Sequence, residues 1–362
     1  MIRLRRGTVT EVGEARPGVI ELQVEVEGGS ARALAYPDLT GPVKRGDTVV
    51  LNTTAVALGL GTGGFHLVMA VEGAEPTQVE PDGRVMKARY TPVQTAVTSV
   101  EETHKDLLEA SSGLDGTPVV VAPLHSQIAH VASGAKVAGA ERVVYVMTDG
   151  ASLAGALSHL VPRLRAAGII EGFVTSGQAF GGELEAATVW SGLLAAKEIL
   201  NADVIVVADG PGALGTDTTW GASPLTSGNS LNAAGTLGGR PVAVLRVSFA
   251  DERERHHGVS HHSITVLADV CLVEANVAVP TLEAPERHEV WAALRAAELE
   301  KKHKLVEVLG FPAIHALEEA GVEVTSMGRG LEDDPIFFLA AGGAGILAGR
   351  MASGKAAWKP TA

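Results

Sequence analysis

The chain has 362 residues, of which 46% are hydrophobic and only 4% aromatic, with 43 glycines and a single cysteine. This length predicts two domains, and one cysteine excludes an internal disulfide framework. The net charge is −13, and after residue 90 the chain holds 19 basic against 31 acidic residues, so nucleic acid is not expected as a partner.

We expect neither a secretory signal nor a membrane span. Its start, MIRLRRGTVTEVGE, has basic residues but no apolar core. The longest apolar stretch, residues 335–349, has about 15 residues, fewer than the roughly 20 that a membrane span needs. We therefore expect a soluble cytoplasmic protein that has no membrane partner.

Residues 1–75 contain five short runs of β-branched and apolar residues, separated by Gly, Pro and Asp turns. This spacing predicts a small closed β-barrel, which leaves no exposed sheet edge. The polar, proline-containing stretch 72–84 indicates a boundary. We expect a barrel domain over 1–75, a linker with a connecting helix over 76–117, and an α/β domain with C-terminal helices over 118–352.

From residue 118 onward, apolar runs alternate with helical stretches. Continuous apolar strands between amphipathic helices predict a Rossmann-like, mostly parallel sheet that is covered by helices on both faces. The clearest helical patterns span 151–168 and 182–200, and a long charged helix is expected over 285–310. Cys271 lies in an apolar run, 269–277, that we expect to be a strand.

Polar side chains follow almost every predicted strand. In open α/β sheets, ligands bind beyond the carboxyl ends of the strands, so we expect these residues to surround one site. The alternative is that they are ordinary turn and helix-capping residues. They are, in chain order, His125, Ser126, Gln127, Asp149, Ser176, Gln178, Asp209, Asp217, Arg246 and Asp251.

Residues 210–215, GPGALG, match the glycine pattern of dinucleotide-binding loops. The context does not fit, because no apolar helix opening follows and Asp209 and Asp217 would repel a pyrophosphate. NAD is therefore not expected as a cofactor. We expect Gly210 and Gly212 to let the backbone approach another ligand closely.

The most conspicuous segment is HHGVSHHS, residues 256–263. Three interpretations remain open: a divalent metal site that uses His257 and His261, an acid–base or anion-binding site, or a structural loop. Successive side chains of an extended backbone point to opposite sides. We therefore expect two histidines, His261 and one of the first pair, to face the pocket.

Seven segments together resemble one bacterial family that is described only as a domain of unknown function. The resemblance covers nearly the whole chain and implies a full-length member, but it implies no activity, cofactor or catalytic residue. It marks His125, Asp149, Asp209, His261 and His262 as family hallmarks. The segments are NTTAVALGLGTGGFHLV, KARYTPVQ, PLHSQIAH, MTDGASL, GPGALGT, RVSFADERERHHGVSHHS and SMGRGLEDDP.

The leading hypothesis is a cytoplasmic enzyme that hydrolyses, or transfers a group from, a small polar or phosphorylated metabolite. His261 or His262 would act as base or metal ligand, and Asp149 or Asp209 would orient it or share the metal; His125 is a further catalytic candidate. The second hypothesis is a non-catalytic ligand sensor or assembly scaffold, with the barrel as a partner-binding module. Both hypotheses are compatible with a homo-oligomer. The expected substrate-binding residues are Gly210, Gly212, Ser126, Gln127, Ser176, Gln178 and Arg246.

Overall fold

The computed structural model describes residues 2–60, 63–75, 83–216 and 218–354. The chain divides into two compact units, Met1–Val97 and Thr98–Ala362. Part of the expected linker, 76–82, lies outside the described residues. The rest of it holds a two-stranded hairpin, β6 (Val85–Lys87) with β7 (Thr95–Val97), and two short helices, α3 (Val100–Thr103) and α4 (Lys105–Ala110).

In the described part of the first unit, five strands form a closed barrel in the order β1-β2-β3-β5-β4. Alternate residues such as Val9, Leu22, Val24 and Leu51 fill its interior, as the period of two in the sequence requires. The small barrel predicted from the sequence is therefore confirmed. Its elements are β1 (Leu4–Arg16), β2 (Val19–Val26), β3 (Gly29–Ala35), α1 (Pro37–Thr40), β4 (Thr48–Asn52), α2 (Thr54–Ala57) and β5 (Phe65–Val71).

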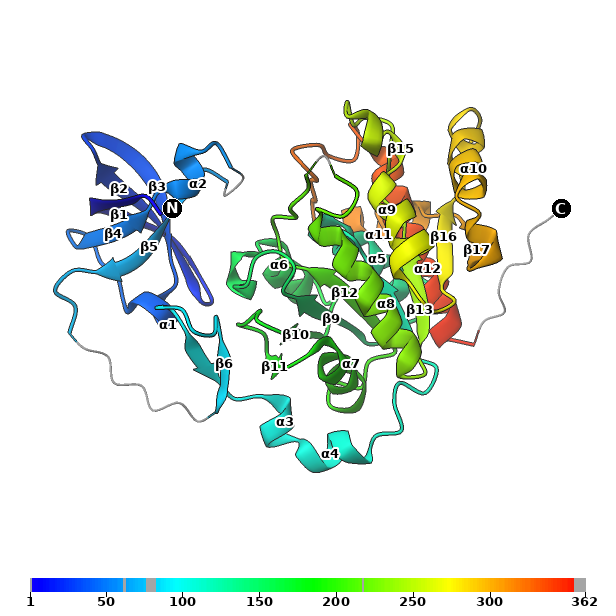
Figure 1. Ribbon diagram of the computed structural model, residues 1–362, viewed down its shortest axis with the longest axis horizontal. Helices are drawn as coiled ribbons and strands as arrows, with labels where there is room; N and C mark the ends of the chain where they lie inside the picture. The colour runs from blue at the N-terminus through cyan, green and yellow to red at the C-terminus, as the bar shows by residue number, and fades with distance from the viewer. Residues whose placement is uncertain (1, 61–62, 76–82, 217, 355–362) are drawn as a thin grey trace. The chain divides into compact units, whose positions relative to one another are not determined.

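In the described residues of the second unit, eight strands form a parallel sheet in the order β11-β10-β9-β12-β8-β13-β16-β17 (Figure 1). The central strands are Val/Ile-rich and almost completely buried, as expected for a parallel sheet covered on both faces. The strands are β8 (Pro118–Val121), β9 (Val143–Thr148), β10 (Gly172–Ser176), β11 (Leu184–Ala186), β12 (Val204–Asp209), β13 (Arg240–Val244), β16 (Asn276–Pro280) and β17 (Lys304–Val308).

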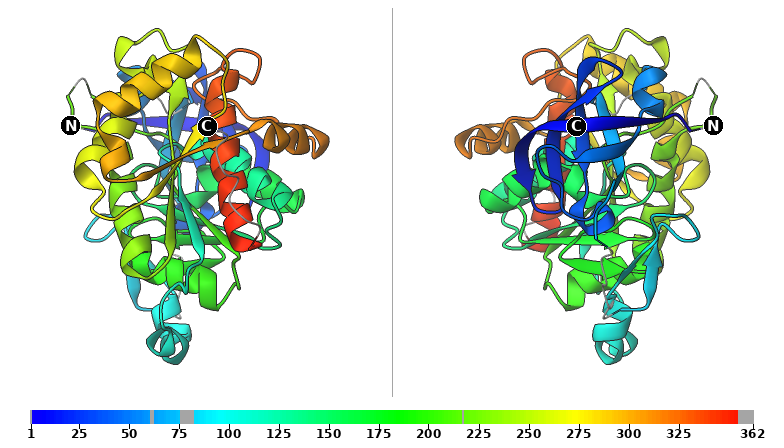
Figure 2. Two further views of the ribbon diagram at one scale, coloured as in Figure 1. Left: turned by 90° about the vertical axis from the view of Figure 1, so that its right-hand side faces the viewer. Right: turned by 90° about the vertical axis from the view of Figure 1, so that its left-hand side faces the viewer.

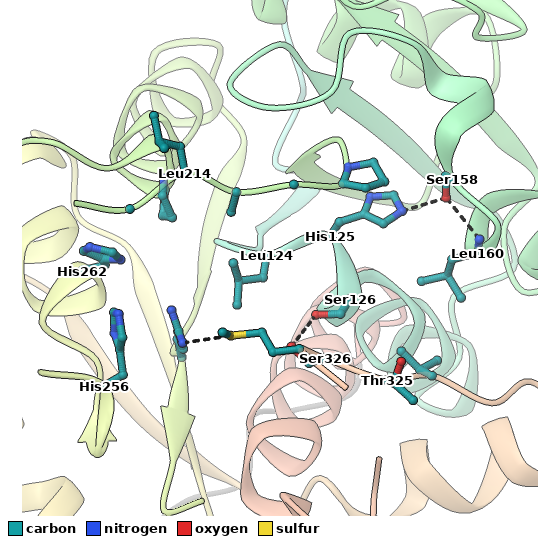
Figure 3. A pocket seen from close by; sticks show the side chains of 18 of the residues that line it. Leu124, His125, Ser126, Ser158, Leu160, Leu214, His256, His262, Thr325 and Ser326 are labelled. Atoms are coloured by element: carbon teal, nitrogen blue, oxygen red, sulfur yellow. Dashed lines mark hydrogen bonds between the residues drawn. The ribbon is translucent and has the colours of Figure 1, made fainter. Parts of the chain in front are cut away.

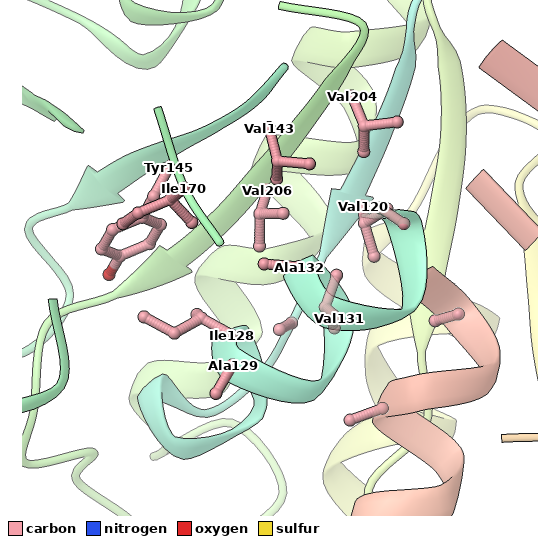
Figure 4. Packing of buried hydrophobic residues seen from close by; sticks show 14 of the residues in the cluster. Val120, Ile128, Ala129, Val131, Ala132, Val143, Tyr145, Ile170, Val204 and Val206 are labelled. Carbon is pink, nitrogen blue, oxygen red and sulfur yellow. The ribbon is translucent and has the colours of Figure 1, made fainter. Parts of the chain in front are cut away.

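Helices cover both faces of this sheet, which confirms the predicted α/β fold (Figure 2). One face packs against α5 (Ile128–Val137), α6 (Leu160–Ala166), α11 (Phe311–Glu319) and α12 (Pro335–Ala352). Figure 4 shows Ile128 and Val131 of α5 facing Val120 and Val206 of the sheet. The other face packs against α7 (Val189–Glu198), α8 (Thr226–Thr236), α9 (His261–Thr265) and α10 (Glu286–Ala296).

Helix α12 is long and apolar enough to cross a membrane, but 67% of it is buried inside the second unit. Its glycines allow it to lie directly on α5: a Cβ atom at Gly345 would collide with the carbonyl oxygen of Val131, and one at Gly349 with that of Ala135. This burial is typical of a core helix in a soluble protein.

Four segments differ from the expected secondary structure. Of the stretch 151–168, expected to be helical, only Leu160–Ala166 forms an α-helix, and the single 3-10 turn Gly155–Leu157 precedes it. The stretches 182–200 and 285–310, expected to be helical, each contain an additional strand, β11 and β17. Both strands are short and lie at the sheet edges, so their period of two is lost within a longer helical pattern. Residues Val266–Val270 form a π-helical turn, and the strand expected over 269–277 begins only at Asn276.

The connections of the two central strands position the site. Strand β8 leads into α5 on one face, whereas its neighbour β12 leads into α8 on the opposite face. Where successive helices leave a parallel sheet on opposite sides, a crevice opens at the carboxyl ends of the strands.

Candidate functional site

A pocket of about 630 Å³ lies at the carboxyl ends of β8 and β12, entirely within the second unit. Figure 3 shows His256 and His262 side by side at one end and His125 with Ser158 at the other. The pocket brings together segments that are up to about two hundred residues apart in the sequence. The described residues that line it are 124–126, 157–160, 163, 211–215, 224, 246, 253, 255, 256, 262 and 323–327.

Three histidines gather at one end. The potential ligand nitrogens of His256, His261 and His262 all lie within 4.8 Å of one another. The ring centroids of His261 and His262 are 4.1 Å apart, and those of His256 and His262 are 5.0 Å apart. This histidine cluster, His256–His261–His262, combines members of both sequence pairs.

We expected His261 and one of the first pair to face the pocket, but the described residues that line it include His256 and His262 and not His261. The local backbone explains why His261 nevertheless joins the other two in one cluster. His261 and His262 open α9, and the Ser260 side chain caps this helix by accepting the His262 N–H at 3.3 Å. Neighbouring side chains in a helix turn are about 100° apart, so both can reach one point. His256 approaches from a single 3-10 turn, Glu254–His256.

His257, expected as a metal ligand together with His261, lies elsewhere. Its side chain is 47% exposed, 3.9 Å from a Glu289 carboxylate oxygen, with its ring edge against Phe249. His256 occupies the position in the cluster that the sequence interpretation had assigned to His257. The short turn before His257 decides which of the two histidines joins the cluster. The composition of the segment does not reveal this turn.

Three of the six ring nitrogens in the histidine cluster have no hydrogen-bond partner among the described residues. His261 Nε2 and both ring nitrogens of His262 are buried and unpartnered. His256 is held more firmly: its Nδ1 lies 2.8 Å from Ser260 Oγ, and Arg255 Nε donates to its Nε2 at 3.4 Å. Buried polar atoms without partners are rare in proteins and point to a ligand.

The environment keeps these imidazoles neutral at pH 7. Burial, followed by the charges of Arg246 and Arg253, lowers the pKa of His256 to about 3. Burial and the neighbouring His261 lower the pKa of His262 to about 4. Burial and Arg255 also lower the pKa of His261. A neutral imidazole can coordinate a metal ion or accept a proton.

Guanidinium groups surround the histidine cluster. Asp251 accepts hydrogen bonds from Arg246 Nη2 at 2.9 Å and from Arg253 through Nη2 at 2.8 Å and Nε at 2.9 Å. Arg329 Nη2 lies 3.5 Å from the same carboxylate, and its Nε is 3.3 Å from Asp334. These bonds, led by that from Arg253, hold the pKa of Asp251 well below its usual range.

Positive charge exceeds negative charge in the pocket. Two carboxylates, Asp251 and Asp334, hold three guanidinium groups. Among the described lining residues, Arg163 and Arg255 add two more positive charges, and Glu323 adds one negative charge. The described residues of the pocket therefore carry a net positive charge, although the chain as a whole is acidic. The arginines of the segment ADERER were not predicted as site residues, although their place directly before the histidines was a signal.

At the other end of the pocket, His125 belongs to a complete hydrogen-bond network. Ser158 Oγ accepts the backbone N–H groups of Leu160 and Val161, at 3.2 and 3.1 Å. Ser158 Oγ also forms a hydrogen bond with His125 Nε2, 2.7 Å away. The opposite nitrogen, Nδ1, lies 3.2 Å from Tyr145 Oη.

Tyr145 continues the network into the sheet. Its hydroxyl donates to the carbonyl oxygens of Ala208 and Asp209, both at 3.2 Å. Both ring nitrogens of His125 are thus in use, and burial lowers the pKa of His125 to about 4. Neither Ser158 nor Tyr145 was expected from the sequence, because they lie 33 and 20 residues from His125.

The two predicted aspartates are not among the described residues that line the pocket. Asp209 is buried, and Oδ1 accepts from Thr148 Oγ1 at 2.6 Å and from the Gly150 N–H at 3.0 Å. Its Oδ2 accepts from Thr226 Oγ1 at 2.9 Å. Burial raises the pKa of Asp209. The carboxylate thus joins the loop after β9 to the start of α8.

Asp149 performs a similar task on the exposed side of the same edge. Its Oδ2 accepts the backbone N–H of Gln178 at 2.7 Å, which fixes the loop after β10. Ser176 is buried and donates to the Met147 carbonyl at 3.2 Å. Asp149, Ser176 and Gln178 are therefore placed in loop contacts and are not among the residues that line the pocket.

Three of the predicted substrate-binding residues line the pocket: Ser126, Gly212 and Arg246. Ser126 Oγ donates to Ser326 Oγ at 3.0 Å. Gly212 has a φ of +95°, and a Cβ atom there would meet nothing within 4 Å, so its backbone faces open space.

Two others lie inside the protein. Gln127 is buried, and its Nε2 donates to the Leu245 carbonyl at 3.3 Å. Gly210 is required by the protein itself, since a Cβ atom there would lie 2.6 Å from the Ser152 carbonyl oxygen. Asp217 lies outside the described residues.

A model of the protein family described as "Protein of unknown function (DUF3866)" matches residues 32–345. No curated protein matches the chain. The matched range contains every described residue that lines the pocket. It confirms the resemblance inferred from the seven sequence segments.

Proposed function

The chain belongs to the DUF3866 family, whose function is unknown, and we propose that it is an enzyme that hydrolyses, or transfers a group from, a small anionic metabolite. The observation that carries this proposal is the juxtaposition of neutral imidazoles and surplus guanidinium groups in one pocket. It lies where open α/β sheets bind their ligands.

The charge of the pocket supports an anionic substrate. Guanidinium groups form paired, charge-assisted hydrogen bonds with phosphates and carboxylates. Arg253 is fixed by two bonds to Asp251, so little side-chain freedom is lost when it binds a ligand. A volume of about 630 Å³ suits a metabolite-sized molecule.

The imidazoles support hydrolysis or group transfer. A neutral histidine can take a proton from an attacking water or hydroxyl group, or hold a metal ion that activates it. We do not propose a dinucleotide as ligand, because after GPGALG the next described helical turn begins only at Ser223 and the helix α8 at Thr226. The fingerprint requires a helix N-terminus at that point.

We also propose that the enzyme works in the bacterial cytoplasm on a small-molecule substrate, without nucleic acid or membrane as a partner. The motifs shared with a bacterial family and the acidic charge of the chain support this. A homo-oligomer is compatible with it.

The test is a thermal-shift screen of the full chain. Phosphorylated sugars, nucleoside phosphates and small carboxylates should raise the melting temperature, whereas their neutral counterparts should not. Arg253→Ala should weaken the binding of any hit by about tenfold, and Arg295→Ala, an exposed arginine of α10 outside the pocket, should not. Hits are then tested for turnover.

Two results would contradict the proposal. If no anion stabilises the protein, or if Arg295→Ala weakens binding as much as Arg253→Ala, the pocket is not the anion site. If a ligand binds tightly in the pocket and is never converted, the protein is a ligand sensor.

A further inference from the structure

We propose that His256, His261 and His262 bind a divalent transition-metal ion of the zinc type, with an open coordination position toward the pocket. Only the substrate of this metal site rests on the function proposed above. The metal site itself can be tested without any substrate.

The geometry supports three imidazole ligands on one ion. Zinc–nitrogen bonds are about 2.0–2.1 Å long, so two nitrogens of one tetrahedral ion lie roughly 3.3 Å apart. The potential ligand nitrogens of the histidine cluster lie within 4.8 Å of one another. Small rotations of the side chains therefore bring them to bonding distance. Three protein ligands with one open position are typical of catalytic zinc sites.

The hydrogen bonds favour a cation over an anion at this point. Arg255 Nε donates to His256 Nε2, so that nitrogen carries a lone pair and Nδ1 carries the hydrogen, which is donated to Ser260 Oγ. A metal ion at this lone pair would take the place of the Arg255 N–H, whose bond is longer than usual at 3.4 Å. The lone pair would repel an anion. His261 Nε2 and both nitrogens of His262 are free of other partners in the described structure.

Ser260 acts as a positioning residue for the site. Its Oγ contacts His256 Nδ1 and also caps the helix that carries His261 and His262. Metal-binding histidines commonly donate their second ring N–H to an oxygen that fixes the ring and its tautomer. Ser260 thus links the two halves of the cluster.

The positive charge of the surrounding arginines disfavours the binding of a metal ion alone. It favours a metal ion that also binds an anionic ligand. The imidazoles are neutral, so a divalent ion would keep its full charge. Part of the guanidinium charge is balanced by Asp251 and Asp334. The guanidinium charge that these two carboxylates leave unbalanced would attract an anionic substrate to the open position. When bound, the ion would activate a water molecule or polarise the substrate.

The experiment uses the full chain, stripped with a chelator and dialysed against Zn²⁺. Metal content by mass spectrometry should be roughly one zinc per chain. Co²⁺ should give the visible absorption of a four-coordinate nitrogen site. His262→Ala should lower zinc affinity more than tenfold. His257→Ala, a histidine of the same segment that points away, should retain it.

The Co²⁺ spectrum of the unmodified chain decides the question even if His262→Ala does not fold. Absence of stoichiometric zinc and of this spectrum would overturn the metal site, as would an equal loss in His257→Ala. If zinc binds and no anion does, the metal site stands and the proposed function fails. If anions bind equally well in the presence of a chelator and no zinc binds, the proposed function stands and the metal site fails.

Discussion

Both ends of the pocket contain buried histidines, but the hydrogen bonding of these histidines differs. At both ends burial lowers a histidine pKa to about 4, as for His125 and His262. Both nitrogens of His125 have partners, whereas neither nitrogen of His262 has one among the described residues. The two ends therefore do not differ in residue type or in burial. They differ in how completely the ring nitrogens are hydrogen-bonded.

The difference suggests separate roles. A ligand at His125 would have to replace bonds to Ser158 and Tyr145 that already exist. These bonds instead fix the loop after β8 against β9 and the start of α6. A ligand at the histidine cluster would replace only the long bond, 3.4 Å, from Arg255 to His256 Nε2, and it satisfies three nitrogens whose burial otherwise destabilises the fold.

The strongest test of this comparison is turnover. On an identified substrate, His256→Ala should lower kcat by about 10²–10⁴-fold, the usual range for losing a group that activates the nucleophile. His125→Gln should leave the zinc content unchanged. A loss of zinc in His125→Gln equal to that in His256→Ala would show that the two ends form one site.

The two serines beside the histidines give the next test. Ser260→Ala should lower zinc affinity about 10–100-fold, because it removes the group that orients His256. Ser158→Ala removes the equivalent partner of His125 and should leave zinc affinity unchanged. Equilibrium titration against a competing chelator measures both. Equal affinities in the two variants would exclude a positioning role for Ser260.

The closed network should matter for stability. His125→Ala removes the ring that joins Ser158 to Tyr145 and should lower the free energy of unfolding by about 1–3 kcal/mol. Urea denaturation of the metal-free protein measures this. His257→Ala, an exposed change, should stay within about 0.5 kcal/mol of the unmodified protein. If His125→Ala is equally neutral, the network is not structural.

Much of the fold could be predicted from the sequence, because the buried strands of a parallel sheet are continuous apolar runs such as VIVVAD in β12. The edge strands β11 and β17 could not, since three to five residues inside a helical pattern carry too little signal. The location of a pocket beyond the strand ends followed from topology alone.

Which polar residues face that pocket could not be predicted. Asp209 points to Thr148, Gly150 and Thr226, which are 17 to 61 residues away in the sequence. The choice between His256 and His257 depends on one 3-10 turn. Such orientations are set by tertiary partners, whereas the order of residues along a strand end only places them at the same edge.

The pH dependence of stability gives the smallest expected effect, and it concerns the closed end. His125 has a pKa of about 4 in the folded protein and about 6.5 when unfolded. Between these values the unfolded chain binds more protons at this position, so stability falls as the pH decreases from about 6.5 toward 4. The groups that face the ring are the hydroxyls of Tyr145 and Ser158 and the backbone of Asp209.

His125→Gln keeps a donor and an acceptor in place but cannot titrate. Its stability should therefore fall less steeply with acidification than that of the unmodified protein, by roughly 1 kcal/mol for the first pH unit below 6.5. Urea unfolding at pH 7.0, 6.0 and 5.0 in chelator measures the difference, and the remaining buried histidines contribute equally to both proteins. Parallel pH profiles would mean that His125 is protonated as easily in the folded chain as in water, and the closed network would then not describe the protein in solution.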